Sequence, residues 1–229
     1  MLSETDELHK EIIGHFEIDS CESYKKEIDE AISKSVRFEY SSYREPGYGY
    51  GGYYNPNWGD FLVVGGYKKG KLLKSCKMPK KFGYQYGFDD SGRLIFDHSC
   101  FDNETRIFDN FGIYKYEENS VYVVRGSIRS DDFYYIDAWS KAIYDKNRIK
   151  DYYLYEGLIT NLDCKSTQIF FLHQYSYTYS EDEIVYIKKT RLTQTKSTYE
   201  RYRFILDENQ EILFYYDEKG NKYFNWRVK

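Results

Sequence analysis

The sequence predicts a mainly β fold, an antiparallel meander that forms a barrel or a strongly curved sheet, preceded by two short N-terminal helices. Three observations lead to this prediction. From residue 36 onward, short stretches alternate apolar and polar residues with the two-residue period of a half-buried strand. Breaks rich in Asp, Glu, Asn and Gly separate these stretches, and no long helical pattern lies between them. Tyrosine, which favours strands, supplies 28 of the 229 residues.

Residues 1–35 are expected to form a helical segment that packs on the sheet. In SETDELHKEIIGHF, apolar residues recur at four-residue spacing and therefore share one helix face. In SCESYKKEIDEAISKS, Ser20 is suited to cap the N-terminus of a second helix. The predicted apolar stripes are Leu8, Ile12 and Phe16 in the first helix, and Tyr24, Ile28, Ala31 and Ile32 in the second.

Residues 36–229 are expected to form a single antiparallel β domain. Polar breaks such as DDSG at 89–92 and DEKGN at 217–221 supply the residues that tight turns require. The stretch DAWSKAIYDKN at 137–147 fits a strand or a helix, because Trp139 and Ile143 also lie at helical spacing. The predicted strands are VRFEY, FLVVGGY, KLLKSCK, FGYQYGF, RLIFDHS, FGIYKYE, VYVVRGS, QIFFLHQYSYTY, IVYIKKT, YRFIL, EILFYY and KYFNW.

A short internal repeat links two of the predicted hairpins. Residues 88–96 read FDDSGRLIF and residues 216–224 read YDEKGNKYF, so both combine an aromatic residue, Asp, two polar residues and Gly. Turns at YEENSVY and YDKNRIKDYY begin in the same way. The pattern predicts one hairpin used repeatedly, with an acidic residue opening the turn and Gly or Asn in the left-handed conformation. It resembles the YD-type hairpin repeats of large bacterial polymorphic toxins and of some small proteins encoded near them.

The segment 43–59 reads YREPGYGYGGYYNPNWG and gathers large rings on a glycine-rich backbone. Tyr and Trp offer a large contact area for few torsions, and both are enriched at interface hot spots. One alternative is a long loop whose rings seal the end of the sheet, and another is an irregular edge strand with glycine bulges. The predicted partner-binding residues are Tyr43, Tyr48, Tyr50, Tyr53, Tyr54 and Trp58.

The charge of the chain argues against nucleic acid as the partner, because 37 acidic residues outnumber 33 basic ones and the net charge is -4. The lysines between residues 68 and 81 are interpreted as protection of an exposed sheet edge, with a local basic patch as the alternative. The start MLSETDELHK has no signal-peptide pattern, and no stretch reaches the apolar length of a membrane helix. A cytoplasmic location with reduced cysteines is therefore expected.

Motifs for catalysis and metal binding are weak. Gly47, Gly49 and Gly52 match GxGxxG, but a turn and a strand follow them instead of the helix that a dinucleotide site requires. His98 and Cys100 would share one strand face, for which a buried thiol is the simpler explanation. No cofactor or metal site is expected. The carboxylates outside predicted turns, which an acid–base hydrolase could use, are Glu39, Glu156 and Asp163.

These observations favour a non-catalytic binding protein. The resemblance to proteins of toxin loci implies an immunity protein that binds and neutralises a cognate toxin domain. Two alternatives are a carbohydrate- or small-ligand-binding β module, with aromatic faces for stacking, and a carboxylate-based hydrolase. The sequence leaves the oligomeric state open.

Overall fold

The structure is a computed structural model that describes residues 7–18, 20–42, 71–74, 77, 81–102, 109–128, 134–159, 167–191, 196–208 and 212–224. Within these residues thirteen strands form one antiparallel sheet, preceded by two helices. The mainly β meander predicted from the sequence is confirmed. The strands are β1 (Arg37–Ser42), β2 (Lys71–Leu72), β3 (Lys81–Phe88), β4 (Leu94–Asp102), β5 (Asp109–Glu117), β6 (Ser120–Ile128), β7 (Tyr134–Asp145), β8 (Arg148–Ile159), β9 (Thr167–Tyr179), β10 (Glu183–Arg191), β11 (Ser197–Leu206), β12 (Ile212–Tyr216) and β13 (Lys222–Phe224).

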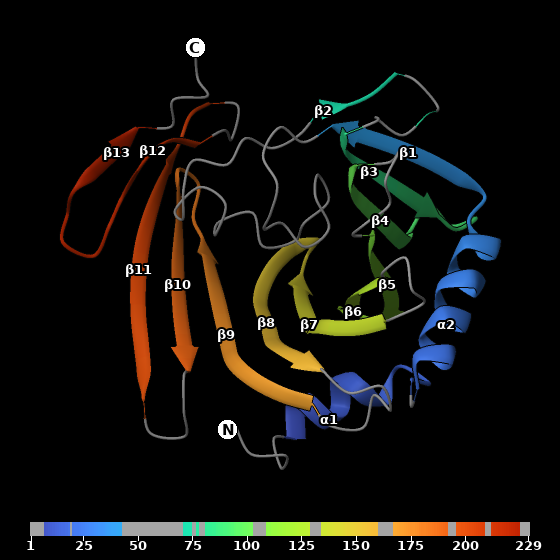
Figure 1. Cartoon of the computed structure of the whole chain (residues 1–229). Helices are drawn as coiled ribbons and strands as arrows, with labels where there is room; N and C mark the ends of the chain where they lie inside the picture. The colour runs from blue at the N-terminus through green and yellow to red at the C-terminus, as the bar shows by residue number, and fades with distance from the viewer. Residues whose placement is uncertain are drawn as a thin grey trace.

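From β3 to β13 each strand lies beside its neighbour in the chain, and β1 lies between β3 and β2. The described sheet is open, because β2 and β13 are its two ends and do not pair with each other. Figure 1 shows that it nevertheless curves strongly, with β1 and β2 at one end of the arc and β12 and β13 at the other. Of the two predicted shapes, the structure is therefore the strongly curved sheet.

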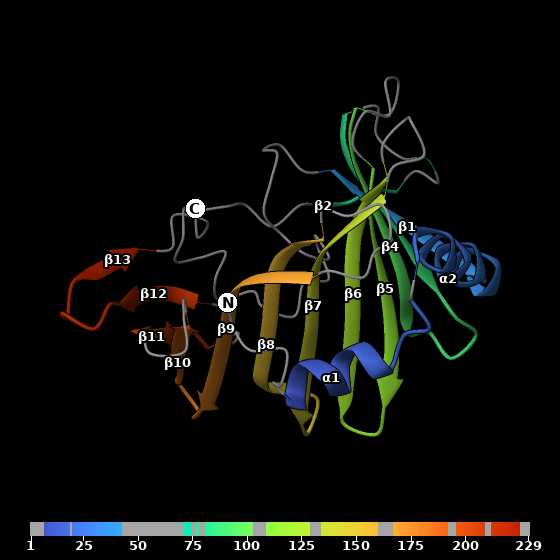
Figure 2. The ribbon, with the colours of Figure 1, turned by 60° about the horizontal axis from the view of Figure 1, so that its bottom comes forward.

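The predicted helices are present at the N-terminus as α1 (Glu7–Gly14) and α2 (Cys21–Lys34). Ser20 caps α2 as expected, because its Oγ accepts a hydrogen bond from the backbone N–H of Ser23, and the Ser23 hydroxyl oxygen in turn accepts one from the Ser20 N–H. Both helices lie against the outer side of the curved sheet, α2 beside β3–β5 and α1 beside β7 (Figures 1 and 2).

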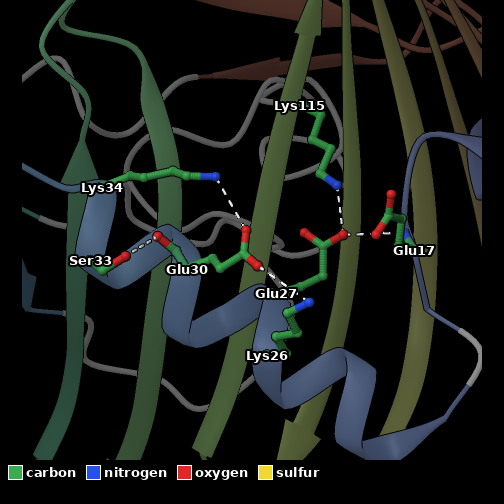
Figure 3. A network of polar contacts seen from close by, with 7 residues as sticks. All are labelled: Glu17, Lys26, Glu27, Glu30, Ser33, Lys34 and Lys115. Carbon is green, nitrogen blue, oxygen red and sulfur yellow. Dashed lines mark hydrogen bonds and ion pairs between the residues drawn. The ribbon is translucent and has the colours of Figure 1, made fainter.

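Polar contacts fix the helices to this outer face. The Nζ of Lys115 on β5 donates to Glu27 Oε1 at 2.7 Å, and that oxygen also accepts the backbone N–H of Glu17 at 3.1 Å (Figure 3). The Tyr24 hydroxyl donates to the backbone oxygen of Phe111 at 3.0 Å. Glu11 on α1 accepts from the Tyr122 hydroxyl at 2.7 Å. Three of these bonds join a helix to a strand, and the bond from Glu17 to Glu27 joins the segment between the helices to α2, so together they set where the helices sit.

Apolar packing between the helices and the outer face forms one core cluster. Its helical residues include Ile12, Tyr24 and Ile28, which are at most 3% exposed. The sheet contributes side chains that alternate along each strand, among them Trp139 and Tyr155. The predicted apolar stripes are confirmed except at Ile32, which is 39% exposed at the end of α2.

The inner, concave face of the sheet carries two further clusters of buried side chains. One extends over β7–β12 and contains Leu154, Tyr186 and Phe204. The other extends over β3–β6 and contains Tyr86 and Tyr114. The central strands are buried on both faces. Residues 137–145 belong to strand β7 and not to a helix, with Ala138 facing the inner cluster and Trp139 the outer one, and residues 146–147 form the turn that follows.

The repeated hairpin predicted at residues 88–96 and 216–224 is confirmed in detail. Gly92 and Gly220 both have φ of +80°, the left-handed conformation that favours glycine. Asp89 Oδ1 accepts the backbone N–H of Arg93 at 2.8 Å, and Asp217 Oδ1 accepts that of Asn221 at 2.8 Å. The turn after β7 instead places Lys146 and Asn147 at positive φ, which suits a two-residue hairpin loop. One acid-opened turn therefore recurs at these two positions, whereas the turn at YEENSVY, which the prediction included, has no residue at positive φ.

Candidate functional site

The six residues predicted to bind a partner, Tyr43, Tyr48, Tyr50, Tyr53, Tyr54 and Trp58, lie outside the residues that the structure describes. Asp163 also lies outside them. Glu39 is on β1 and forms an ion pair with Arg37. His98 on β4 stacks on Phe111 with 4.5 Å between ring centres. Of the lysine-rich stretch, Lys71 lies in β2, at one end of the described sheet, and Lys81 lies in β3, between β4 and β1.

The meander places five hairpin turns along one rim of the sheet. The turns that follow β3, β5, β7, β9 and β11 all lie at the same end of the strands, because successive strands are antiparallel. Figure 2 shows the turns between β5 and β6 and between β7 and β8 at the lower edge. Every one of the five turns contains acidic residues. We call the following set the acidic rim: Asp89, Asp90, Glu117, Glu118, Asp145, Glu181, Asp182, Glu183, Asp207 and Glu208.

Few cations offset the acidic rim. Within the same turns and the strand ends beside them the bases are Arg93, Lys146 and Arg148, and Arg203 of β11 forms an ion pair with Glu183. Asp89 remains ionised, because the hydrogen bonds that it accepts from the Arg93 backbone and the Ser91 hydroxyl outweigh the effect of burial and lower its pKa. The individual acids were visible in the sequence as turn residues. Their alignment along one rim depends on the strand order, which the sequence pattern did not supply.

On the inner face, a buried ion pair spans β5. Asp97 on β4 and Arg125 on β6 are 0% and 5% exposed, and they form a two-point interaction through Nη1–Oδ1 at 2.8 Å and Nη2–Oδ2 at 2.5 Å. Both residues are in register with Gly112 of β5, whose missing side chain leaves the room they occupy. Burial favours a neutral guanidinium, but the carboxylate outweighs it and raises the pKa of Arg125.

Tyr114 completes this network by donating its hydroxyl proton to Asp97. Burial, followed by the charge of Asp97, raises the pKa of Tyr114 well above its ordinary value, so the phenol stays protonated. Beside Arg125 the inner face leaves a cavity of about 10 Å³, enough for about one water molecule. The cavity is too small for an organic substrate, so this part of the inner face is a packed polar core.

A second polar chain crosses β8, β9 and β10 on the inner face. His173 Nε2 lies 2.9 Å from Glu156 Oε2, and His173 Nδ1 lies 2.9 Å from Thr190 Oγ1. An ionised carboxylate only accepts, so Nε2 carries a proton. The order hydroxyl–imidazole–carboxylate is that of a hydrolytic triad. Thr190 is only 7% exposed, however, which favours a structural role that links three strands.

Asp137 occupies a bulge of β7, where Arg125 pairs with Ala138 and Gly126 with Ile136. Its Oδ1 is shielded from solvent and has no hydrogen-bond partner among the described residues. Burial, with a smaller contribution from Glu156, raises the pKa of Asp137 to about 7, although the Arg125 charge opposes this. The carboxyl is therefore partly protonated at neutral pH. Sequence reasoning missed Asp137, because only the bulge and the burial distinguish it from an ordinary strand residue.

Tyrosine rings form a continuous ladder along the inner face from β8 to β13. The ring centres of successive tyrosines lie 5.7, 5.8, 5.9, 6.0 and 5.0 Å apart. Exposure increases along the ladder, from 0% at Tyr186 to 42% at Tyr223. The tyrosine ladder thus joins the buried centre of the sheet to its exposed end. In order across the strands it consists of Tyr152, Tyr175, Tyr186, Tyr202, Tyr215 and Tyr223.

The described residues contain neither a metal-binding cluster nor a helix suited to span a membrane. No group of three or more His, Cys, Asp or Glu in this part of the chain could hold a metal ion. None of its helices is long and apolar enough to cross a membrane. Comparison of the chain with protein-family models, with curated proteins and with solved structures finds no match.

Proposed function

We propose that this protein is a non-catalytic binding protein, an immunity protein that neutralises a bacterial toxin domain in the cytoplasm, and that the acidic rim faces that toxin. The observation that carries the proposal is the alignment of acidic turns from β3 to β12 along one end of the sheet. A protein of this kind needs a complementary surface and a rigid scaffold, and it needs no catalytic group.

The acidic rim suits a basic partner such as a nuclease, whose surface attracts negatively charged nucleic acid. Concentrated charge of one sign steers a partner of opposite sign and raises the association rate, an effect that salt weakens. Blocking a nuclease in this way places carboxylates where the substrate's phosphates would lie. The net charge of -4 for the whole chain adds to the same attraction.

The remainder of the sheet supports the proposal by keeping the turns in place. The Glu156–His173–Thr190 chain and the tyrosine ladder join neighbouring strands through side chains as well as through the backbone, and the buried Asp97–Arg125 pair joins β4 to β6 across β5. A surface that is already ordered loses less conformational entropy when it binds. The residues of segment 43–59 lie outside the described structure, and their role as a second contact region stays a prediction.

The test is co-purification with the toxin domain encoded beside this chain. Formation of a 1:1 complex on size-exclusion chromatography, together with relief of toxicity, supports the proposal. Stopped-flow kinetics then locates the surface: Glu118→Gln/Asp182→Asn, both exposed in the acidic rim, should lower the association rate several-fold at low salt and change dissociation little.

The matched control is Glu22→Gln/Asp29→Asn, which removes the same charge from exposed positions of α2. If the rim variant and the control slow association equally, net charge alone is responsible and the acidic rim is not the contact surface. The absence of any complex with a toxic neighbour counts against the immunity function itself.

A small-ligand or carbohydrate-binding module remains the second candidate, and the exposed end of the tyrosine ladder favours it. Tyr223 is 42% exposed, and its ring lies stacked at 5.0 Å from Tyr215. Binding on a glycan array that Tyr223→Ala abolishes would support this candidate.

A further inference from the structure

The outer face of β10–β13 lies away from both helices. In Figures 1 and 2 these strands form the end of the sheet farthest from α2, and α1 lies beside β7. Leu172 packs against the core cluster between the helices and the sheet, so its side chain is on the outer face. Arg191 pairs with Leu172 and therefore also faces outward, as does every second residue of β10 counted from Arg191. We call the following set the outer platform: Glu183, Val185, Ile187, Lys189, Arg191, Ser197, Tyr199, Arg201, Arg203, Ile205, Phe214, Tyr216 and Lys222.

The outer platform is strongly basic in a chain that is acidic overall. It contains the cations Lys189, Arg191, Arg201, Arg203 and Lys222, and its one acid, Glu183, forms an ion pair with Arg203. The other acid of these two strands, Glu200 on β11, lies on the inner face, where it accepts a hydrogen bond from the Tyr202 hydroxyl. The fold therefore separates charge: the turns at one end of the strands are acidic, and this face of the strands is basic.

Aromatic rings lie between these cations. Tyr199 is 61% exposed, and the Lys189 Nζ lies 5.4 Å from its ring centre. The Arg203 guanidinium lies 5.9 Å from the ring centre of Tyr216, and the Lys222 Nζ lies 3.7 Å from that of Phe214. Rings and cations thus alternate across four adjacent strands, and the most exposed large ring among them is on β11.

We infer that the outer platform binds single-stranded nucleic acid, with Tyr199 stacking on a base and Lys189, Arg201 and Arg203 contacting phosphates. Proteins bind single-stranded nucleic acid without sequence preference through aromatic side chains on a basic sheet surface, because every base has a face that can stack on a ring. A duplex keeps its bases paired and cannot use the exposed ring. Although the charge of the whole chain argues against a nucleic-acid partner, the charge of this face favours one.

This inference is independent of the proposed immunity function. The outer platform and the acidic rim share only Glu183, at the start of β10, and nucleic-acid binding can be measured with the isolated protein in the absence of any toxin. A failure of one proposal therefore leaves the other in place.

The experiment is fluorescence anisotropy with labelled twelve-nucleotide oligo-dT and oligo-U, and with a duplex of equal length, at several salt concentrations. We expect at least one single strand to bind at least about tenfold more tightly than the duplex. Tyr199→Ala should weaken this binding at least about fivefold without changing its salt dependence. Lys189→Gln should reduce the slope of log affinity against log salt by about 0.7, the value for one lost phosphate contact on a single strand.

The controls are Tyr223→Ala, which removes an exposed tyrosine from the inner face, and Lys26→Gln, which removes an exposed lysine from α2. Both should leave binding unchanged. The inference is overturned if neither oligonucleotide binds, if Tyr199→Ala binds as tightly as the parent protein, or if a polyglutamate peptide competes as well as the oligonucleotide. The last result would mean that the face takes an acidic protein.

Discussion

The side chains of Arg125 on β6 and Asp97 on β4 form an ion pair across the strand between them, β5. They meet above the one residue of β5 that has no side chain. Gly112 of β5 is in register with Asp97 on β4 and with Arg125 on β6. A Cβ at residue 112 would overlap the Asp97 carboxylate and the Arg125 guanidinium. Three residues on three strands therefore form one unit, in which the glycine is as necessary as the two charges.

Removal of either charge should be strongly destabilising. Asp97→Ala leaves Arg125 buried with its main partner gone, and we expect a loss of about 3–5 kcal/mol in the free energy of unfolding. The double variant Asp97→Leu/Arg125→Met should lose much less than the sum of the two single variants, because it buries no unpaired charge. Urea denaturation measures all of these. Additive losses would contradict the description of the pair as a coupled unit.

Gly112→Ala should cost about 1–3 kcal/mol, the usual range for overpacking, because the added methyl group displaces the ion pair. Gly14→Ala is the matched control: residue 14 is exposed at the end of α1, and a Cβ there meets no atom within 4 Å. That variant should change stability by about 1 kcal/mol or less, in the stabilising direction. Thermal unfolding of the two proteins side by side decides the comparison.

Asp137 should make stability fall as the pH rises. Its pKa in the folded protein is about 7, above the ordinary value of 3.8, so the folded state binds more protons than the unfolded chain between these values. Stability is therefore lost as the pH rises through this window, and the penalty is complete above about pH 7. Asp137→Asn removes the charge, and we expect it to gain about 2–4 kcal/mol over the parent protein at about pH 8 and little at about pH 4. Denaturation at both pH values measures this, and an equal effect at both would contradict the assignment.

The tyrosine ladder should show a gradient of stability effects. Tyr186→Ala removes a fully buried ring that contacts rings on the two neighbouring strands, β9 and β11, and we expect a loss of about 3–5 kcal/mol. Tyr223→Ala, at the exposed end, should cost about 1 kcal/mol or less. Guanidinium denaturation of the two variants tests this. Similar losses at the two positions would show that the ladder is stabilised as a whole and not by local burial.

Much of this fold could be predicted from the sequence, because the signals are local. The cap at Ser20 and the paired turns around Gly92 and Gly220 depend on a few neighbouring residues, and all are confirmed. The alternation of apolar and polar residues disappears where both faces of a strand are buried. For this reason the sequence of β7 fits a strand or a helix, and the sequence pattern predicts no strand at β8.

The surfaces were harder to predict, because they depend on which strands lie side by side. The acids of the turns are scattered along the sequence, and only the strand order aligns them in the acidic rim. The basic outer platform arises in the same way. Neither Lys189 nor Arg201 belongs to a recognisable sequence motif, and only the register between β10 and β11 brings them to one face of the sheet. The inner polar chain of Glu156, His173 and Thr190 likewise joins residues that no local motif links.

The strand order also predicts the order in which the parts of the chain fold. From β3 to β13 each strand pairs with the next, so the contacts are short-range and each hairpin can form soon after its residues meet. The strand β1 is different, because Arg37 pairs with Phe88 and must wait for β3 across the long intervening segment. The helices of the N-terminus precede β1, so they should dock late, onto a sheet that has already assembled from its hairpins.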